Sequence, residues 1–207
     1  MNKELSKRIL SSIVLIPMSF FFIITGSYLF NLFILICLIF TIYEWYLMTK
    51  KKNYKIIGYF FLLFSFYSVY FVRNELGDNS IFVFIFIILI CICTDIGGYV
   101  FGKTFKGPKL TKISPKKTYT GVFGGYFLSI IVILILFNTN DYFLKNLENF
   151  GFNFLIFIIM ISTVSQIGDI IVSYFKRLSK IKDTGNLIPG HGGILDRIDG
   201  MIFAFPF

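Results

Sequence analysis

Residues 152–199 read FNFLIFIIMISTVSQIGDIIVSYFKRLSKIKDTGNLIPGHGGILDRID, and this stretch decides the fold. Its first half is an apolar run long enough to cross a bilayer as a helix, which takes about 20 residues. A carboxylate, Asp169, lies inside that run. The second half holds a glycine-rich turn at residues 189–193, followed by Asp196 and Asp199, whose spacing of three puts them on one face of a helix. The stretch therefore predicts a membrane helix that ends in a site of charged groups.

Similar apolar runs recur along the whole chain. Of its 207 residues, 56% are hydrophobic and 28 are Phe, a composition typical of a polytopic membrane protein. The predicted spans are residues 9–24, 32–48, 56–72, 81–101, 121–137 and 152–175. We expect an all-α transmembrane helical bundle with about six complete spans and a partial seventh at residues 201–207. Residues 1–207 are interpreted as one integral-membrane domain, whose catalytic portion is mainly 90–207.

The net charge of +9 is distributed in a pattern that excludes nucleic acid as the natural partner. Of the 20 Lys and Arg residues, 18 lie in four clusters, at the N-terminus, 50–55, 103–117 and 176–197. The segments between these clusters carry only Arg73 and Lys145, an alternation typical of the positive-inside rule. It predicts that the N-terminus and the segments 103–117 and 176–199 are cytoplasmic, and it favours anionic lipid and phosphate as partners.

Two further patterns fit a membrane bundle. Cys37, Cys91 and Cys93 lie inside apolar runs, where buried small hydrophobes are far commoner than a metal pair or a disulfide. Glu44 comes just before Trp45 and Tyr46 near the end of the second span. Because Trp and Tyr are enriched at membrane interfaces, we expect this group at the bilayer surface.

The last span carries the first group of candidate site residues. Gln166, Asp169, Ser173 and Lys176 are three or four residues apart and therefore share a helix face. A carboxylate within a span indicates a functional site, and an ion pair with a neighbouring helix is the structural alternative. Asp95, in the fourth span, has the same character, with a helix-end contact to a lysine as an almost equal alternative.

The loops supply weaker candidates. Ser114, Lys116 and Lys117 form a basic turn with hydroxyls, although such loops are more often topology signals that attract lipid headgroups. His191 is the only histidine and could carry a proton, donate to a phosphate or pack the loop. Lys182 and Asp183 are either phosphate contacts or solvated. Carboxylates, glycines and lysines together suit Mg²⁺ and phosphate, because Mg²⁺ takes oxygen ligands and phosphate takes N–H groups and cations.

These residues form a long ordered signature. It consists of S-x-x-K-R (Ser173, Lys176, Arg177), then K-D (Lys182, Asp183), then P-G-H-G-G-x-x-D-R-x-D, which includes Gly190, His191, Gly192, Gly193, Asp196, Arg197 and Asp199. The chain closely resembles the phosphatidate cytidylyltransferases, also called CDP-diglyceride synthetases. The resemblance covers the last half of the chain by motif and the first spans by hydropathy.

The resemblance implies a multi-pass inner-membrane, Mg²⁺-dependent nucleotidyltransferase of phospholipid biosynthesis that joins CTP to phosphatidate and releases diphosphate. It implies that Asp169, Asp196 and Asp199 gather around the metal, with room for a second cation and for a homodimer. Beside these aspartates, the hypothesis gives catalytic roles to Lys176 and His191. It gives substrate roles to Ser173, Arg177, Lys182, Asp183, Gly190, Gly192, Gly193, Arg197, Ser114, Lys116, Lys117 and Asp95.

Two other functions remain open from the residues alone. One is another membrane lipid phosphotransferase, of the CDP-alcohol phosphotransferase or polyprenol kinase type, although the D-G-x-x-A-R pattern of the first is absent. The other is an ion-coupled transporter that uses Asp95 and Asp169. A transport path should also have polar groups through the outer halves of the spans, and the charged groups here cluster at the inner ends instead.

Overall fold

The computed structural model describes residues 3–50, 52–138 and 151–207, which are helical apart from turns and connecting loops. The six long helices are α1 (Lys3–Thr25), α2 (Ser27–Thr49), α3 (Lys55–Asn74), α4 (Ser80–Phe105), α5 (Tyr119–Asn138) and α7 (Gly151–Leu178). A 3-10 turn, η1 (Gly77–Asn79), connects α3 to α4, and two one-turn helices, α8 (Leu195–Ile198) and α9 (Met201–Ala204), follow α7.

Each of the six long helices is long and apolar enough to cross a membrane, which confirms the predicted all-α bundle of six spans. The observed helices extend the predicted runs by a few residues at their ends. The outer segment predicted between the fifth and sixth spans begins at Asn138, and its remaining residues lie outside the described part of the chain. The three cysteines are free, as expected, and two of them are buried.

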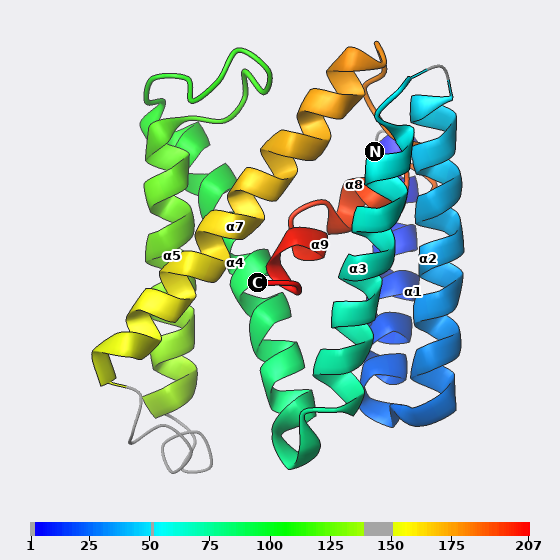
Figure 1. Cartoon of the computed structure of the whole chain (residues 1–207). Coiled ribbons are helices and arrows are strands. Elements are labelled where there is room, and N and C mark those ends of the chain that lie inside the picture. Colours follow the sequence, from blue (N-terminus) through cyan, green and yellow to red (C-terminus); the bar gives the residue numbers. More distant parts are fainter. Residues whose placement is uncertain (1–2, 51, 139–150) are drawn as a thin grey trace.

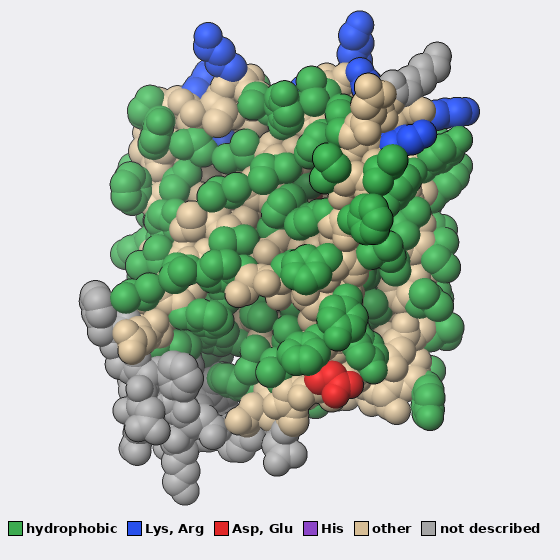
Figure 2. Space-filling model, viewed as in Figure 1, with side chains coloured by type: hydrophobic (Ala, Val, Ile, Leu, Met, Phe, Trp, Pro, Cys, Tyr) green, Lys and Arg blue, Asp and Glu red, His purple; other side chains and the backbone are tan. Residues whose placement is uncertain are grey.

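The long helices form two groups (Figure 1). Helices α1, α2 and α3 stand side by side, α4 and α5 form the other side, and α7 runs obliquely across α4 and α5. The connections after α2, α4 and α7 lie at one end of the bundle. On the face drawn in Figure 2, the Lys and Arg side chains gather at this same end, which we call the basic end.

Glycines bring α4 and α5 into very close contact. A Cβ atom at Gly97 would overlap the carbonyl oxygen of Gly124, and one at Gly121 would lie 2.7 Å from the carbonyl oxygen of Gly98. Small residues at such crossings let helix backbones approach, which is how many membrane helices pack. The contact fixes α4, and therefore Asp95, against the helix that follows the basic loop.

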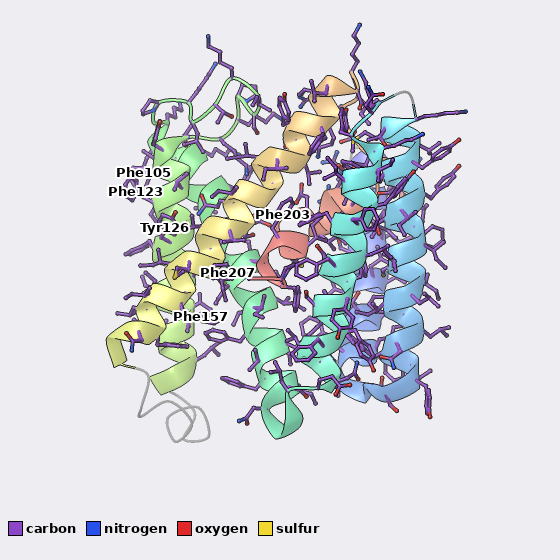
Figure 3. The ribbon with its side chains drawn as sticks, viewed as in Figure 1. Phe105, Phe123, Tyr126, Phe157, Phe203 and Phe207 are labelled. Carbon is purple, nitrogen blue, oxygen red and sulfur yellow. The ribbon has the colours of Figure 1, made fainter. Side chains whose placement is uncertain are left out.

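The chain after α7 is where the structure differs from the sequence-based expectation. Residues 195–205 lie within the bundle, where α8 contacts α2 and α9 contacts α3, α4 and α7. Leu195 and Ala204 are each 1% exposed, and Figure 3 shows Phe203 between α7 and α3, with its ring 4.4 Å from that of Phe61. The segment 176–199, which is predicted to be cytoplasmic, is therefore packed in part among the long helices, because the apolar side chains of α8 and α9 are buried there.

Trp45 points into the bundle, whereas a residue of an outward-facing aromatic belt would contact lipid. This side chain is 5% exposed and packs on Gly58 of α3, where a Cβ atom would overlap the indole ring. Its indole N–H donates to the carbonyl oxygen of Lys55 at 3.0 Å, and its ring meets Phe175 of α7 at 5.2 Å. Trp45 therefore joins α2 to α3 and α7 instead of facing the membrane surface.

The close α4–α5 contact predicts different effects of the same substitution at two adjacent glycines. Gly97→Ala places a methyl group against a backbone carbonyl, so we expect it to destabilise the protein by about 1–3 kcal/mol. Gly98→Ala is the matched control, since its Cβ would lie 3.6 Å from the nearest carbonyl oxygen, which is ordinary contact. Thermal unfolding in detergent measures both variants, and equal stabilities would contradict the packing described here.

Candidate active site

A buried ion pair ties α7 to α8. Lys176 Nζ donates to Asp196 Oδ1 at 2.8 Å, and the two side chains are 11% and 5% exposed. The same ammonium lies 3.9 Å from Oδ2 of Asp199. The segment after α7 therefore folds back against that helix, as convergence of the carboxylates requires.

The second oxygen of Asp196 organises the glycine-rich loop. Asp196 Oδ2 accepts the N–H of Thr184 at 2.7 Å and the N–H of Gly193 at 3.0 Å, and it lies 3.0 Å from the Thr184 hydroxyl oxygen. Burial by itself raises the pKa of Asp196, but the hydrogen bonds from Lys176 and from the Gly193 N–H hold it below its usual value. Asp196 is therefore ionised, and its hydrogen bonds connect Thr184 with Gly193 of the glycine-rich loop.

A second charged group lies about two turns away on α7. Lys117, at the end of the basic loop, forms an ion pair with Asp169 and lies 3.4 Å from the carbonyl oxygen of Gln166. The Ser173 hydroxyl donates to Asp169 Oδ1 at 3.3 Å. The predicted shared face of α7 is confirmed by these contacts, and Lys117 brings the loop before α5 to it.

Asp199 lies between the two groups. Its Oδ1 accepts the N–H of Gly200 at 2.9 Å. Burial and repulsion by Asp169 and Asp95 raise the pKa of Asp199, against the attraction of Lys176. Asp95 is exposed on α4, from where its charge acts on Asp199 through space, and Lys103 contacts Tyr99. Among the described residues no lysine forms an ion pair with Asp95, so the structural alternative, a helix-end contact with a lysine, is not found. We call Asp95, Lys117, Asp169, Lys176, Asp196 and Asp199 the charged cluster.

His191 connects the glycine-rich loop to α1. Its Nδ1 lies 2.8 Å from the Ser11 hydroxyl and its Nε2 lies 3.4 Å from the Ser12 hydroxyl. Burial and the positive charges of Arg197 and Arg8 lower the pKa of the His191 ring. Among its three expected roles, these contacts favour packing of the loop.

The loop backbone is held at both sides. Arg8 donates to the carbonyl oxygen of Gly190 at 2.8 Å, and Arg197 donates to that of His191 at 2.8 Å. Gly190 and Gly192 have φ of 78° and 87°, conformations that other residues rarely adopt. The backbone conformation of the turn therefore explains why glycine occupies both positions.

Other predicted substrate residues lie at the end of α7 and in the loops that follow α4 and α7. Arg177 is exposed and donates to the carbonyl oxygen of Ile181, while Lys182 and Asp183 are exposed in the loop after α7. Ser114 accepts the Lys117 N–H in a turn that leaves Lys116 exposed. Their substrate roles stay predictions.

Two residues of the site escaped the sequence analysis. Glu44 of α2 is 1% exposed and accepts hydrogen bonds from Thr184, Ile194 and Leu195. A carboxylate inside an apolar run is the signal that singled out Asp169, and the neighbouring aromatic residues led to its interpretation as an interfacial group. Thr184 carries no pattern of its own, because its role depends on contacts with residues distant in the sequence.

Beside the charged cluster lies an apolar cavity of about 210 Å³. It is lined by side chains of α2, α3, α7, α8 and α9, among them Leu62, Val172 and Phe203. Leu195, which directly precedes Asp196, forms part of its wall. The cavity and the cluster therefore share α7 and α8.

The buried ion pair predicts a large loss of stability when its cation is removed. Lys176→Gln leaves the carboxylate of Asp196 buried without its counter-ion, and breaking such a pair costs about 3–5 kcal/mol. Lys182→Gln, in the exposed part of the same loop, should leave stability unchanged. Unfolding in detergent compares the two, and a Lys176→Gln protein as stable as the wild type would show that the pair is dispensable.

Comparison with known proteins identifies the family of this chain. The chain matches the model of the cytidylyltransferase family over residues 6–80 and 58–207. It is similar to the phosphatidate cytidylyltransferase of Rickettsia typhi, at 35% identity over 205 residues, with 96% of this chain and 88% of the relative covered. The enzyme of the same name from Rickettsia bellii is 36% identical, with 99% and 89% covered.

A further relative is more similar over a shorter stretch. The phosphatidate cytidylyltransferase of Staphylococcus aureus (strain COL) is 41% identical over 119 residues, which are 55% of this chain and 42% of the relative. The family match, by contrast, runs from residue 6 to residue 207 and includes the whole charged cluster. This chain therefore belongs to the cytidylyltransferase family.

Proposed function

We propose that this protein transfers the cytidylyl group of CTP to phosphatidate, giving CDP-diacylglycerol and diphosphate in phospholipid biosynthesis. One observation carries the proposal: a member of the cytidylyltransferase family gathers carboxylates and lysines from four parts of the chain in an apolar bundle. The two substrates require charged groups inside an apolar bundle, because CTP is dissolved in water and phosphatidate is in the bilayer.

The charged cluster contains two lysines that could bind the phosphates of a nucleoside triphosphate. Lys117 and Lys176 are held near the carboxylates by ion pairs, within reach of phosphate oxygens placed at the same site. In the reaction, a phosphatidate oxygen forms a bond to the α-phosphorus of CTP while the bond to the diphosphate breaks. The attacking phosphate is already ionised, so no strong general base is needed, and the lysines offset the charge of the leaving diphosphate.

The apolar cavity supports a lipid as the second substrate. Its lining side chains are apolar or aromatic, and its wall at Leu195 adjoins Asp196. An acyl chain in this cavity would stay in an apolar setting, as it does in the bilayer, while its headgroup reached the charged cluster.

The residues of the cluster fit a divalent cation. Burial of Asp199 near the carboxylates of Asp169 and Asp95 creates a repulsion that a cation would relieve. Within the described residues, no three His, Cys, Asp or Glu side chains are close enough to hold a metal by themselves. Mg²⁺ is usually bound by one or two carboxylates together with substrate phosphates, which suits this site.

We assign Asp169 and Asp199 as the main Mg²⁺ ligands. Asp196 would lie beside them, held by its ion pair with Lys176 and by its hydrogen bonds to the loop. When bound, the cation would neutralise negative charge on the phosphates of CTP. A second cation and a homodimer remain compatible with this assignment.

The basic end of the bundle is proposed to face the cytoplasm, with the N-terminus and the loops of the site on that side, in the inner membrane of a bacterium. The clustering of Lys and Arg at this end supports the orientation. We expect Lys112→Cys, in the exposed basic loop, to be protected from an impermeant thiol reagent in intact cells. Glu75→Cys, beyond α3 at the opposite end, is the matched control and should react; the reverse result would invert the topology.

The reaction itself is tested with purified protein. Labelled CTP, phosphatidate and Mg²⁺ should give CDP-diacylglycerol, and ATP should be a much poorer substrate. Equal turnover of ATP would point to a lipid kinase, and the absence of any nucleotidyl product would reject the proposal.

The proposed metal ligands predict which carboxylates matter for turnover. Asp169→Asn and Asp199→Asn preserve side-chain volume but remove a charge, so each should lower kcat at least 100-fold, about 2.7 kcal/mol of transition-state stabilisation. Asp183→Asn, in the exposed loop, is the control and should lose much less activity. Normal turnover by Asp169→Asn would leave that residue a structural role only.

A further inference from the structure

Glu44 is a deeply buried carboxylate, with only 1% of its surface exposed. It lies in α2, and its partners are 140 to 151 residues further along the chain. Glu44 Oε1 accepts the N–H of Ile194 at 2.8 Å, while Oε2 accepts the N–H of Leu195 and the Thr184 hydroxyl, both at 2.9 Å. Within the described part of the chain, no Lys or Arg forms an ion pair with it.

Burial of this carboxylate is favourable only when the loop is in place. A charged group inside a membrane bundle is destabilising unless hydrogen bonds replace its water. The three hydrogen bonds to Glu44 all come from residues 184–195, so they exist only when this segment is packed against α2. Glu44 therefore stabilises one position of the loop over others.

Two glycines of the segment fit closely around this carboxylate. A Cβ atom at Gly193 would overlap Glu44 Oε2 and the Thr184 hydroxyl, and one at Gly185 would lie 3.1 Å from Glu44 Oε1. The N–H of Gly193 also donates to Asp196 Oδ2. The lack of a side chain at Gly193 thus allows the loop to contact two carboxylates at once.

Thr184 links Glu44 directly to the charged cluster. Its hydroxyl oxygen lies 2.9 Å from Glu44 Oε2 and 3.0 Å from Asp196 Oδ2. Leu195, whose N–H is bound by Glu44, is the first residue of α8 and directly precedes Asp196. The carboxylate of Glu44 therefore fixes where α8 begins, and through it the positions of Asp196 and Asp199.

We propose that Glu44 is a positioning residue for cytidylyl transfer: it holds residues 184–195 against α2 so that Asp196 and Asp199 lie opposite Asp169 and Lys176. The inference rests on the proposed function. It gives α2, which contributes no member of the charged cluster, a part in the reaction. A displacement of about 1 Å in such a site can lower turnover about 100-fold.

Glu44→Gln is the sharpest test, because the amide has one acceptor oxygen where the carboxylate has two. Whichever way the amide faces, its NH₂ group meets the N–H of Ile194 or Leu195. We expect kcat to fall about 100-fold, while the KM for CTP changes less than about threefold, since Glu44 does not contact the nucleotide in this account. Glu75→Gln makes the same chemical change at an exposed position and should behave like the wild type.

Hydrogen exchange followed by mass spectrometry supplies a readout independent of activity. In Glu44→Gln, the amides of residues 193–195 should exchange faster, while peptides from the α4–α5 contact should keep their wild-type protection. Faster exchange with kcat within about twofold of the wild type would overturn the proposal, because loop position would not matter to turnover. A loss of kcat with unchanged loop protection would overturn it too.

Thr184→Val tests the same link if Glu44→Gln does not accumulate. Valine has the shape of threonine but removes the hydroxyl between Glu44 and Asp196, so kcat should fall about tenfold, whereas Thr184→Ser should restore it. Equal activities of the Val and Ser variants would overturn the proposal. A wild-type protein that makes no CDP-diacylglycerol would reject the proposed function instead, and the exchange experiment would still report whether Glu44 holds the loop.

Discussion

The ion pair between Lys176 and Asp196 is the interaction on which the site depends. It is nearly inaccessible to water, and it joins the last long helix to the first short helix after it. Without it, Asp196 would be buried with no counter-ion, and the contact of α8 with α7 would be destabilised. With it, the glycine-rich loop closes over Asp196, and Asp199 lies near Asp169 and Asp95.

The charged groups divide into those that hold the fold and those free to meet a substrate. Asp196 and Glu44 accept several hydrogen bonds each and order the loop. Asp169, Asp199 and Lys117 have fewer contacts and lie at the centre of the cluster. This division explains how a small bundle can keep many charges in an apolar setting while leaving some available for phosphates and a cation.

The sequence alone predicts the helices because each span is a local apolar run, and it predicts the shared face of α7 because helical spacing is regular. It also predicts the family, since the signature after Ser173 is long and ordered, and the family match confirms this. It does not predict that α8 and α9 lie inside the bundle or that Glu44 binds the loop. The partners of Glu44 are 140 to 151 positions away, so a carboxylate in an apolar run signals that the residue matters but not what it contacts.

The central claim is that α7 and the returning segment form one site for a cation and the phosphates of CTP. A crystal structure with CTP and Mn²⁺ in place of Mg²⁺ tests it most directly, because anomalous scattering locates the ion without reference to activity. The account predicts one ion bound by the carboxylates of Asp169 and Asp199, with the phosphates near Lys117 and Lys176. An ion and nucleotide bound away from both aspartates would contradict it.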